Sequence, residues 1–230
     1  DFGPQQVITT AADGAEDVFA ADLDGDGDID VLSASKTDGE IAWYENIDGL
    51  GSFGAQQVIT TAALDARSVH AADLDGDGYD DLVARSTTGT VTIFWGGPGG
   101  LDIARSTLVP VAADAIDPAT DPHYKEEPKE ARDDARVLAN TVVLNGRPHV
   151  FVPGVGSATL VPVRADRTFG EPLELPCERP MSVAVCDING NGYDDVVVAC
   201  RQGWKDGECS WIFWGGPDGH DSDHKTPLPS

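Results

Sequence analysis

The chain has 230 residues, 40% of them hydrophobic, and carries 15 lysines and arginines against 40 aspartates and glutamates. This apolar content is enough for a buried core, whereas the formal net charge of −25 repels nucleic-acid phosphate and anionic membrane surfaces. The sequence therefore predicts a folded protein with no nucleic-acid partner. It has no run of about 18 apolar residues, which predicts no membrane span.

Short runs of β-branched and aromatic residues, bounded by Gly, Asp, Asn or Pro, recur along the chain and indicate antiparallel strands. One unit contains three of them, at 68–72, 82–86 and 90–95, and residues 56–60 illustrate the fourth type. Four strands in a unit of roughly 50 residues are typical of a propeller blade. We therefore expect one all-β domain over 1–230, a β-propeller of about four four-stranded antiparallel blades. The expected units are 11–61, 62–111, 133–176 and 177–216, the last completed by residues 1–10.

A nine-residue segment with oxygen-bearing side chains at positions 1, 3, 5 and 9 and glycines at positions 4 and 6 occurs three times. The glycines let the backbone turn tightly, so that the oxygens can surround one hard cation, and calcium is the natural candidate. Without a cation, carboxylates this close together repel one another. The side chains predicted to bind calcium are Asp22, Asp24, Asp26 and Asp30, then Asp73, Asp75, Asp77 and Asp81, and finally Asp187, Asn189, Asn191 and Asp195. The third loop, with two carboxylates instead of four, is expected to be the weakest site.

The third unit departs from this pattern. Residues 136–152 occupy the place of the first two strands and their loop, but the acidic spacing is missing, so we predict no metal there. The proline-rich, charged segment 115–132 before it reads as an inserted surface loop.

The two ends of the chain are offset within the repeat. Residues 5–12 repeat 56–63 without change and so read as a fourth strand, whereas the last unit finishes on the third-type strand 210–214. We therefore expect the N-terminal strand to complete the last blade and close a ring. The closure could occur within one chain or between two chains of a homodimer.

The four cysteines are Cys177, Cys186, Cys200 and Cys209, and their spacing matches no zinc site. Cys200 and Cys209 flank a turn-rich segment, so they could form a disulfide across a hairpin or remain free thiols. Cys186 lies on an alternating apolar run and is expected to be a buried thiol.

Three motifs resemble the FG-GAP/VCBS family of calcium-binding propeller repeats, known from integrin α-subunit heads and exported bacterial and fungal proteins. They are the Phe-Gly pairs at 2–3, 53–54 and 169–170, the acidic loops, and the segment 43–49. The resemblance implies calcium between the first two strands of a blade, with a backbone carbonyl ligand at position 7 from Asp28, Tyr79 and Tyr193. Seven blades are usual in the family, and this chain has room for about four.

A helical EF-hand or dockerin-type loop shares positions 1, 3, 5 and 6 of this pattern. Such a loop would place a bidentate Glu at position 12, where this chain has Ser33, Ala84 and Val198. No helical periodicity follows either, which favours the strand hairpin.

Two function classes follow. The first is a calcium-stabilised binding or adhesion module without catalytic activity, extracellular or periplasmic because calcium is abundant there, with a protein or carbohydrate ligand. Trp204 could stack on a sugar ring or simply pack on its own hairpin. The alternative is a polysaccharide hydrolase or lyase, whose candidate residues are His70, Tyr124, Lys125, His123 and His149, although no G-x-S-x-G or H-E-x-x-H motif occurs.

Overall fold

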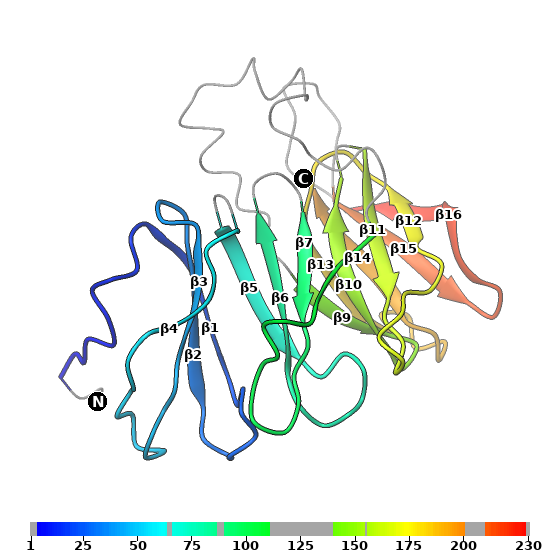
Figure 1. Ribbon diagram of the computed structural model, residues 1–230. Helices are drawn as coiled ribbons and strands as arrows, with labels where there is room; N and C mark the ends of the chain where they lie inside the picture. The colour runs from blue at the N-terminus through cyan, green and yellow to red at the C-terminus, as the bar shows by residue number, and fades with distance from the viewer. Residues whose placement is uncertain are drawn as a thin grey trace, which may run out of the picture.

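The computed structural model describes residues 4–63, 66–86, 90–110, 140–154, 156–200 and 210–228. All regular elements in these ranges are β-strands, and they form four antiparallel sheets of four strands each (Figure 1). In every sheet the neighbours along the chain pair with one another, as in a propeller blade. The all-β architecture of four-stranded blades predicted from the sequence is confirmed.

The four sheets are named blade 1 to blade 4. Blade 1 contains β1 (Ala15–Ala21), β2 (Asp30–Ser35), β3 (Glu40–Tyr44) and β4 (Gln57–Thr60), and blade 2 contains β5 (Ala66–Ala72), β6 (Asp81–Ser86), β7 (Val91–Phe94) and β8 (Ser106–Leu108). Blade 3 contains β9 (Asn140–Leu144), β10 (Arg147–Pro153), β11 (Ser157–Pro162) and β12 (Leu173–Pro176), and blade 4 contains β13 (Pro180–Cys186), β14 (Asp195–Cys200), β15 (Trp211–Gly216) and β16 (Gly219–Pro227).

The core lies between the blades. Because side chains alternate across a strand, the inner blades present apolar residues on both faces, and each face packs on a neighbour. Three clusters of buried residues result, one between blades 1 and 2, one between blades 2 and 3, and one between blades 3 and 4. Leu32 and Leu82, Val83 and Val150, and Phe151 and Phe213 are fully buried members of the three clusters in turn.

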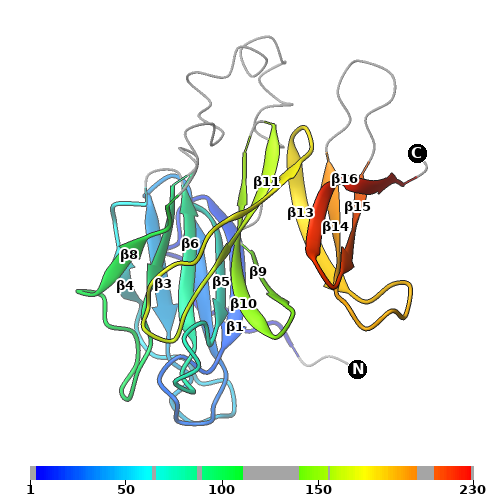
Figure 2. The ribbon, with the colours of Figure 1, turned by 90° about the vertical axis from the view of Figure 1, so that its right-hand side faces the viewer.

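The row of blades is open in this chain, with blade 1 and blade 4 at opposite ends (Figures 1 and 2). Equivalent residues of the inner and outer blades show which apolar positions the open row exposes. Val69 of blade 2 packs on blade 1 and is 2% exposed, whereas its counterpart Val18 on the outer face of blade 1 is 66% exposed. Leu74 packs on blade 3 and is 1% exposed, but its counterpart Ile188 in blade 4 is 45% exposed. Both ends of the row therefore carry apolar positions that the inner blades bury.

The predicted ring closure by the N-terminal strand is wrong in this structure. Blade 4 contains its own fourth strand, β16, whereas residues 5–12 belong to no strand, and Val7 is 63% exposed. The sequence of β16 is polar and lacks the pattern of a strand, but its side chains bind it to β15. Trp214 Nε1 donates to Thr226 Oγ1 at 2.9 Å, and the Lys225 ammonium lies 4.5 Å from the centre of the Trp211 ring.

Blade 3 joins its first two strands by a two-residue turn, Asn145 and Gly146, both with positive φ. This conformation is the usual short hairpin turn and suits these residue types. The acidic nine-residue loop of the other blades is thus replaced here by the shortest hairpin connection. The predicted insertion 115–132 lies outside the described residues.

Three of the four cysteines lie in the described residues. Cys186 is exposed, so the buried thiol predicted from its apolar run is wrong. The alternation of β13 places it with Ala184 on the face of blade 4 that no blade covers. Cys209 lies outside the described residues, so its disulfide with Cys200 stays a prediction. Cys177 lies beside Cys200, and hydrogen bonding to Cys200 together with burial raises the pKa of the Cys177 thiol. Cys177 and Cys186 are free thiols in this structure.

Candidate metal centre

The three acidic segments form the loops β1–β2, β5–β6 and β13–β14, at the lower end of the blades in Figure 1. Their glycines at positions 4 and 6 all have positive φ, from +72° at Gly190 to +95° at Gly27. Only glycine adopts this conformation without strain, which is the local reason for the Gly-x-Gly spacing. The loops connect strands, so the hairpin prediction is confirmed over the helical one.

Hydrogen bonds within each loop turn its side chains inward in the same way. In the first loop, Asp22 accepts the N–H of Gly25 at 2.9 Å and the N–H of Gly27 at 3.0 Å through its two carboxylate oxygens. Asp73 and Asp187 accept the corresponding N–H groups in the other loops. The residues at positions 3 and 5 each accept the N–H two residues further on. The backbone thereby fixes the oxygens before any cation arrives.

The residue at position 9 has a second role. Asp81 is fully buried and accepts two backbone N–H groups, from Leu74 in its own loop at 2.9 Å and from Gly96 after β7 at 2.7 Å. Asp30 and Asp195 bond in the same way to the equivalent positions of blades 1 and 4. This carboxylate therefore ties each loop to the end of the third strand of its blade.

The glycine at position 96, which donates that bond in blade 2, lies against a backbone carbonyl. A Cβ atom on Gly96 would collide with the carbonyl oxygen of Asp80, whereas one on Gly97 would meet nothing within 4 Å. Gly215 in blade 4 is blocked by the Asp194 carbonyl in the same way. The first glycine of the repeated Gly-Gly-Pro thus leaves room for a backbone carbonyl in blades 2 and 4, whereas blade 1 makes the equivalent bond from Asn46.

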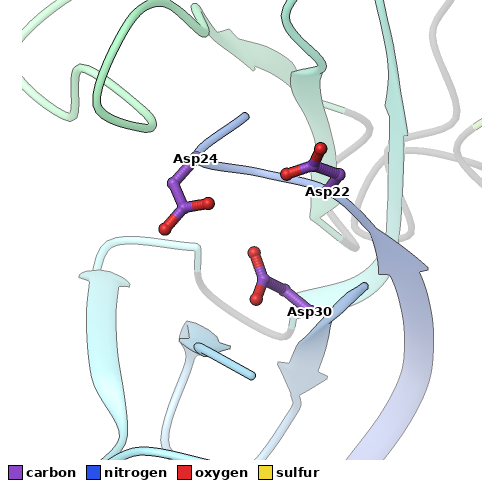
Figure 3. A group of neighbouring side chains, drawn as sticks. All are labelled: Asp22, Asp24 and Asp30. Atoms are coloured by element: carbon purple, nitrogen blue, oxygen red, sulfur yellow. The ribbon is translucent and has the colours of Figure 1, made fainter. Parts of the chain in front are cut away.

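Carboxylate oxygens converge in the first two loops. One oxygen from each of Asp22, Asp24 and Asp30 lies within 4.8 Å of the others (Figure 3). Asp73, Asp75 and Asp81 form the same arrangement in the second loop. Three oxygens this close, on loops that hold them in place, fit a calcium ion.

The remaining predicted ligands are placed less directly. Asp26 and Asp77 lie outside the two converging groups. In the third loop, Asp187, Asn189, Asn191 and Asp195 repeat the internal hydrogen bonds, but the amide nitrogen of Asn191 donates to Gly215 O at 3.2 Å. The carbonyl roles of Asp28, Tyr79 and Tyr193 stay predictions.

Burial and like charge make the ionised carboxylates costly when no cation is bound. Burial raises the pKa of Asp24, and the charges of Asp26, Asp30 and Asp22 raise it further, although a hydrogen bond from Asp26 opposes them. Burial also raises the pKa of Asp81 to about 6, despite the bonds from Gly96 and Leu74. A divalent cation would offset both effects, which is the electrostatic side of the fit.

One further residue contacts the second loop and could not be predicted from the sequence. Arg167, in the turn after β11 of blade 3, donates from Nε to Asp75 Oδ2 at 2.6 Å and from Nη2 to Asp77 Oδ2 at 3.1 Å. It is 92 residues from Asp75 in the chain, so no local motif could have indicated the contact.

The residues of the enzyme alternative have structural surroundings where they are described. His149 is buried and its Nδ1 lies 2.9 Å from Arg147 O, while the His70 ring packs 4.5 Å from the Phe19 ring between centroids. His123, Tyr124, Lys125 and Trp204 lie outside the described residues.

The segments that contain the three acidic loops match models of protein families. A model described as an FG-GAP-like repeat matches residues 22–84, which include the first two loops, and one described as an FG-GAP repeat matches residues 180–200, which include the third. Residues 22–84 and 180–200 are thus FG-GAP-like repeats, as the motifs of the sequence predicted. No curated protein matches it in sequence.

The fold is similar to that of one solved structure, and two others match more weakly. The crystal structure of BBS1N in complex with ARL6DN, soaked with lead, matches with a TM-score of 0.50 and 11% identity, over 90% of this chain and 54% of that one. The same complex soaked with mercury gives a TM-score of 0.33 at 12% identity, covering 89% and 79% of the two chains. A Photorhabdus luminescens Tc holotoxin pore gives 0.28 at 16% identity, covering 99% and 12%. The chain thus spans about half the length of the first of these. Within the described ranges it has no helix with the length and apolar character of a membrane span.

Proposed function

We propose that this chain is a binding or adhesion module of the propeller type whose blades are stabilised by calcium. The observation that carries the proposal is the loop that recurs in three blades with one internal hydrogen-bond pattern, and whose carboxylates converge within 4.8 Å in blades 1 and 2. Calcium is structural in this proposal, because each loop is tied through its buried aspartate to the third strand of its blade.

The residues that would hold the ion also explain its effect on folding. Without calcium, folding brings like charges together against their repulsion, and the folded state loses stability. When the ion is bound, it supplies positive charge to these oxygens, while Asp30, Asp81 and Asp195 hold the loop against the sheet. Binding to the folded state alone stabilises by about 2.7 kcal/mol per site at a calcium concentration of 100 times the dissociation constant.

Compartment and ligand belong to the same proposal. Sites of this kind fill readily at extracellular calcium concentrations, which favours an exported protein, extracellular or periplasmic. The net charge of −25 favours protein or carbohydrate ligands over polyanions. A non-catalytic role is supported by the structural surroundings of His70 and His149.

Calcium titration by calorimetry, together with thermal unfolding in calcium and in excess EDTA, tests this function. We expect binding heat and a melting temperature several degrees higher in calcium, with Asp24→Ala reducing both. Asp218→Ala removes one exposed carboxylate outside the loops and should leave both unchanged. Identical melting curves in calcium and EDTA, without binding heat, would refute the proposal.

A further inference from the structure

We propose that Arg167 is a built-in cation at the second loop, which competes with calcium there and makes this site weaker than the first, although both loops carry four aspartates. The inference rests on the proposed calcium function. It assigns to one residue of blade 3 the control of the calcium affinity of blade 2.

The contacts of Arg167 are those of a cation held at a ligand cluster. Its guanidinium bonds to both Asp75 and Asp77, and Nη2 also donates to Gly96 O at 3.1 Å. The Asp75 side chain is 3% exposed and that of Arg167 is 29% exposed, so the pair is only partly screened by water. Asp75 is also one of the three residues whose oxygens converge in this loop. The arginine therefore occupies an oxygen of a calcium ligand.

The turn that carries Arg167 is built to hold it there. Arg167 has a φ of +63°, and its N–H donates to Arg164 O at 2.8 Å. Thr168 N donates to Asp166 Oδ1 at 3.1 Å and closes the same turn. The guanidinium carbon lies 5.2 Å from the centre of the Trp95 ring, which supports the plane of the group. These contacts leave the Arg167 side chain little conformational freedom, so its contact with Asp75 persists.

The other two loops lack this arginine. Among the described residues, Asp24 and Asp26 of the first loop form no ion pair, and the ring of Tyr79 from blade 2 lies against that loop at Gly25. In the third loop the carbonyl of Gly215, equivalent to that of Gly96, receives the Asn191 amide instead of a charged group. The second loop alone combines the converging carboxylates with an internal positive charge within the described chain.

Two consequences of opposite sign follow. With calcium absent, Arg167 offsets the repulsion between Asp75 and Asp77 and links blade 2 to blade 3. With calcium present, the positive charge of Arg167 repels the ion, and the guanidinium holds an oxygen of the calcium ligand Asp75. One unit charge a few ångströms from a divalent ion weakens binding by about tenfold in a water-like dielectric. A residue with a purely structural role would have only the first effect.

The experiment isolates the second loop by Asp24→Ala and Asp187→Ala, and measures calcium chloride binding by calorimetry with Arg167 and with Arg167→Met. The methionine keeps the apolar stem on Trp95 and removes the charge. We expect calcium to bind about tenfold more tightly to the Arg167→Met variant, while Arg167→Lys, which keeps the charge, stays close to the parent. Arg105→Met, at an exposed position, makes the same change in net charge and should alter nothing.

Thermal unfolding gives a second readout in the otherwise unchanged chain. Arg167→Met should melt at a lower temperature than the wild type in EDTA and gain more from added calcium. Calcium affinity within about twofold of the parent, or weaker, in Arg167→Met would overturn this inference while the proposed function stands. Absence of calcium binding in the unsubstituted chain would overturn the proposed function, and this inference with it.

Discussion

Asp81 offers the sharpest test of how the loops are attached to their blades. It is fully buried, and its two oxygens accept the N–H groups of Leu74 and Gly96. Asp81→Ala leaves both donors without a partner, and each buried unpaired donor costs about 1–3 kcal/mol, or about 2–6 kcal/mol together. Part of that loss is offset, because burial raises the pKa of Asp81 to about 6 and thus opposes its negative charge. We expect a net loss of about 2–3 kcal/mol in the free energy of unfolding.

The measurement is urea unfolding at neutral pH in EDTA, so that bound calcium contributes nothing. Asp81→Asn keeps one acceptor oxygen and should lose about half as much. Asp26→Ala removes an exposed carboxylate from the first loop and should stay within about 0.5 kcal/mol of the wild type. If Asp81→Ala unfolds at the same urea concentration as Asp26→Ala, the buried aspartate does not hold the loop.

Three further outcomes are expected. Gly96→Ala should destabilise the protein by about 1–3 kcal/mol, because its Cβ meets the Asp80 carbonyl, whereas Gly97→Ala should have little effect, and equal unfolding curves would contradict this. Burial lowers the pKa of His149 below its ordinary 6.5, so the folded protein binds fewer protons than the unfolded chain and loses stability as the pH falls through that value. His149→Gln should make this decline shallower in pH-dependent unfolding, and the exposed control His224→Gln should not. The uncovered faces of blades 1 and 4 predict self-association in light scattering, and a mass of 24.2 kDa at all concentrations would show that they stay free.

Much of the candidate metal centre could be predicted from the sequence, because a loop motif confines its chemistry to nine consecutive residues. The spacing of Asp22, Asp24 and Asp30 implies their convergence, and the glycines imply the turn, without knowledge of the rest of the chain. The same holds for the strands, whose boundaries follow Gly and Asp. Arg167 could not be found in this way, because its contact depends on the packing of blade 3 on blade 2.

The last strand, β16, cannot be predicted from the strand pattern of the sequence. Its residues 219–227 are polar and have little strand propensity, so the period-2 signal fails. A weaker signal was present. Trp95 Nε1 bonds to Thr107 in blade 2 and Trp214 Nε1 bonds to Thr226 in blade 4, each pair twelve residues apart. Comparison of these two spacings would have located the fourth strand of the last blade.

The short turn at Asn145 and Gly146 gives blade 3 a different dependence on its surroundings. Its hairpin has its own two-residue turn, and the Asn145 N–H also donates to Asp194 Oδ2 of the third loop at 2.6 Å. Under the proposed function, falling calcium therefore reaches this hairpin only through that neighbouring loop. Loss of the ion should therefore loosen the chain on both sides of a persistent middle segment. Blade 3 would then serve as the surface on which its neighbours reassemble once calcium returns.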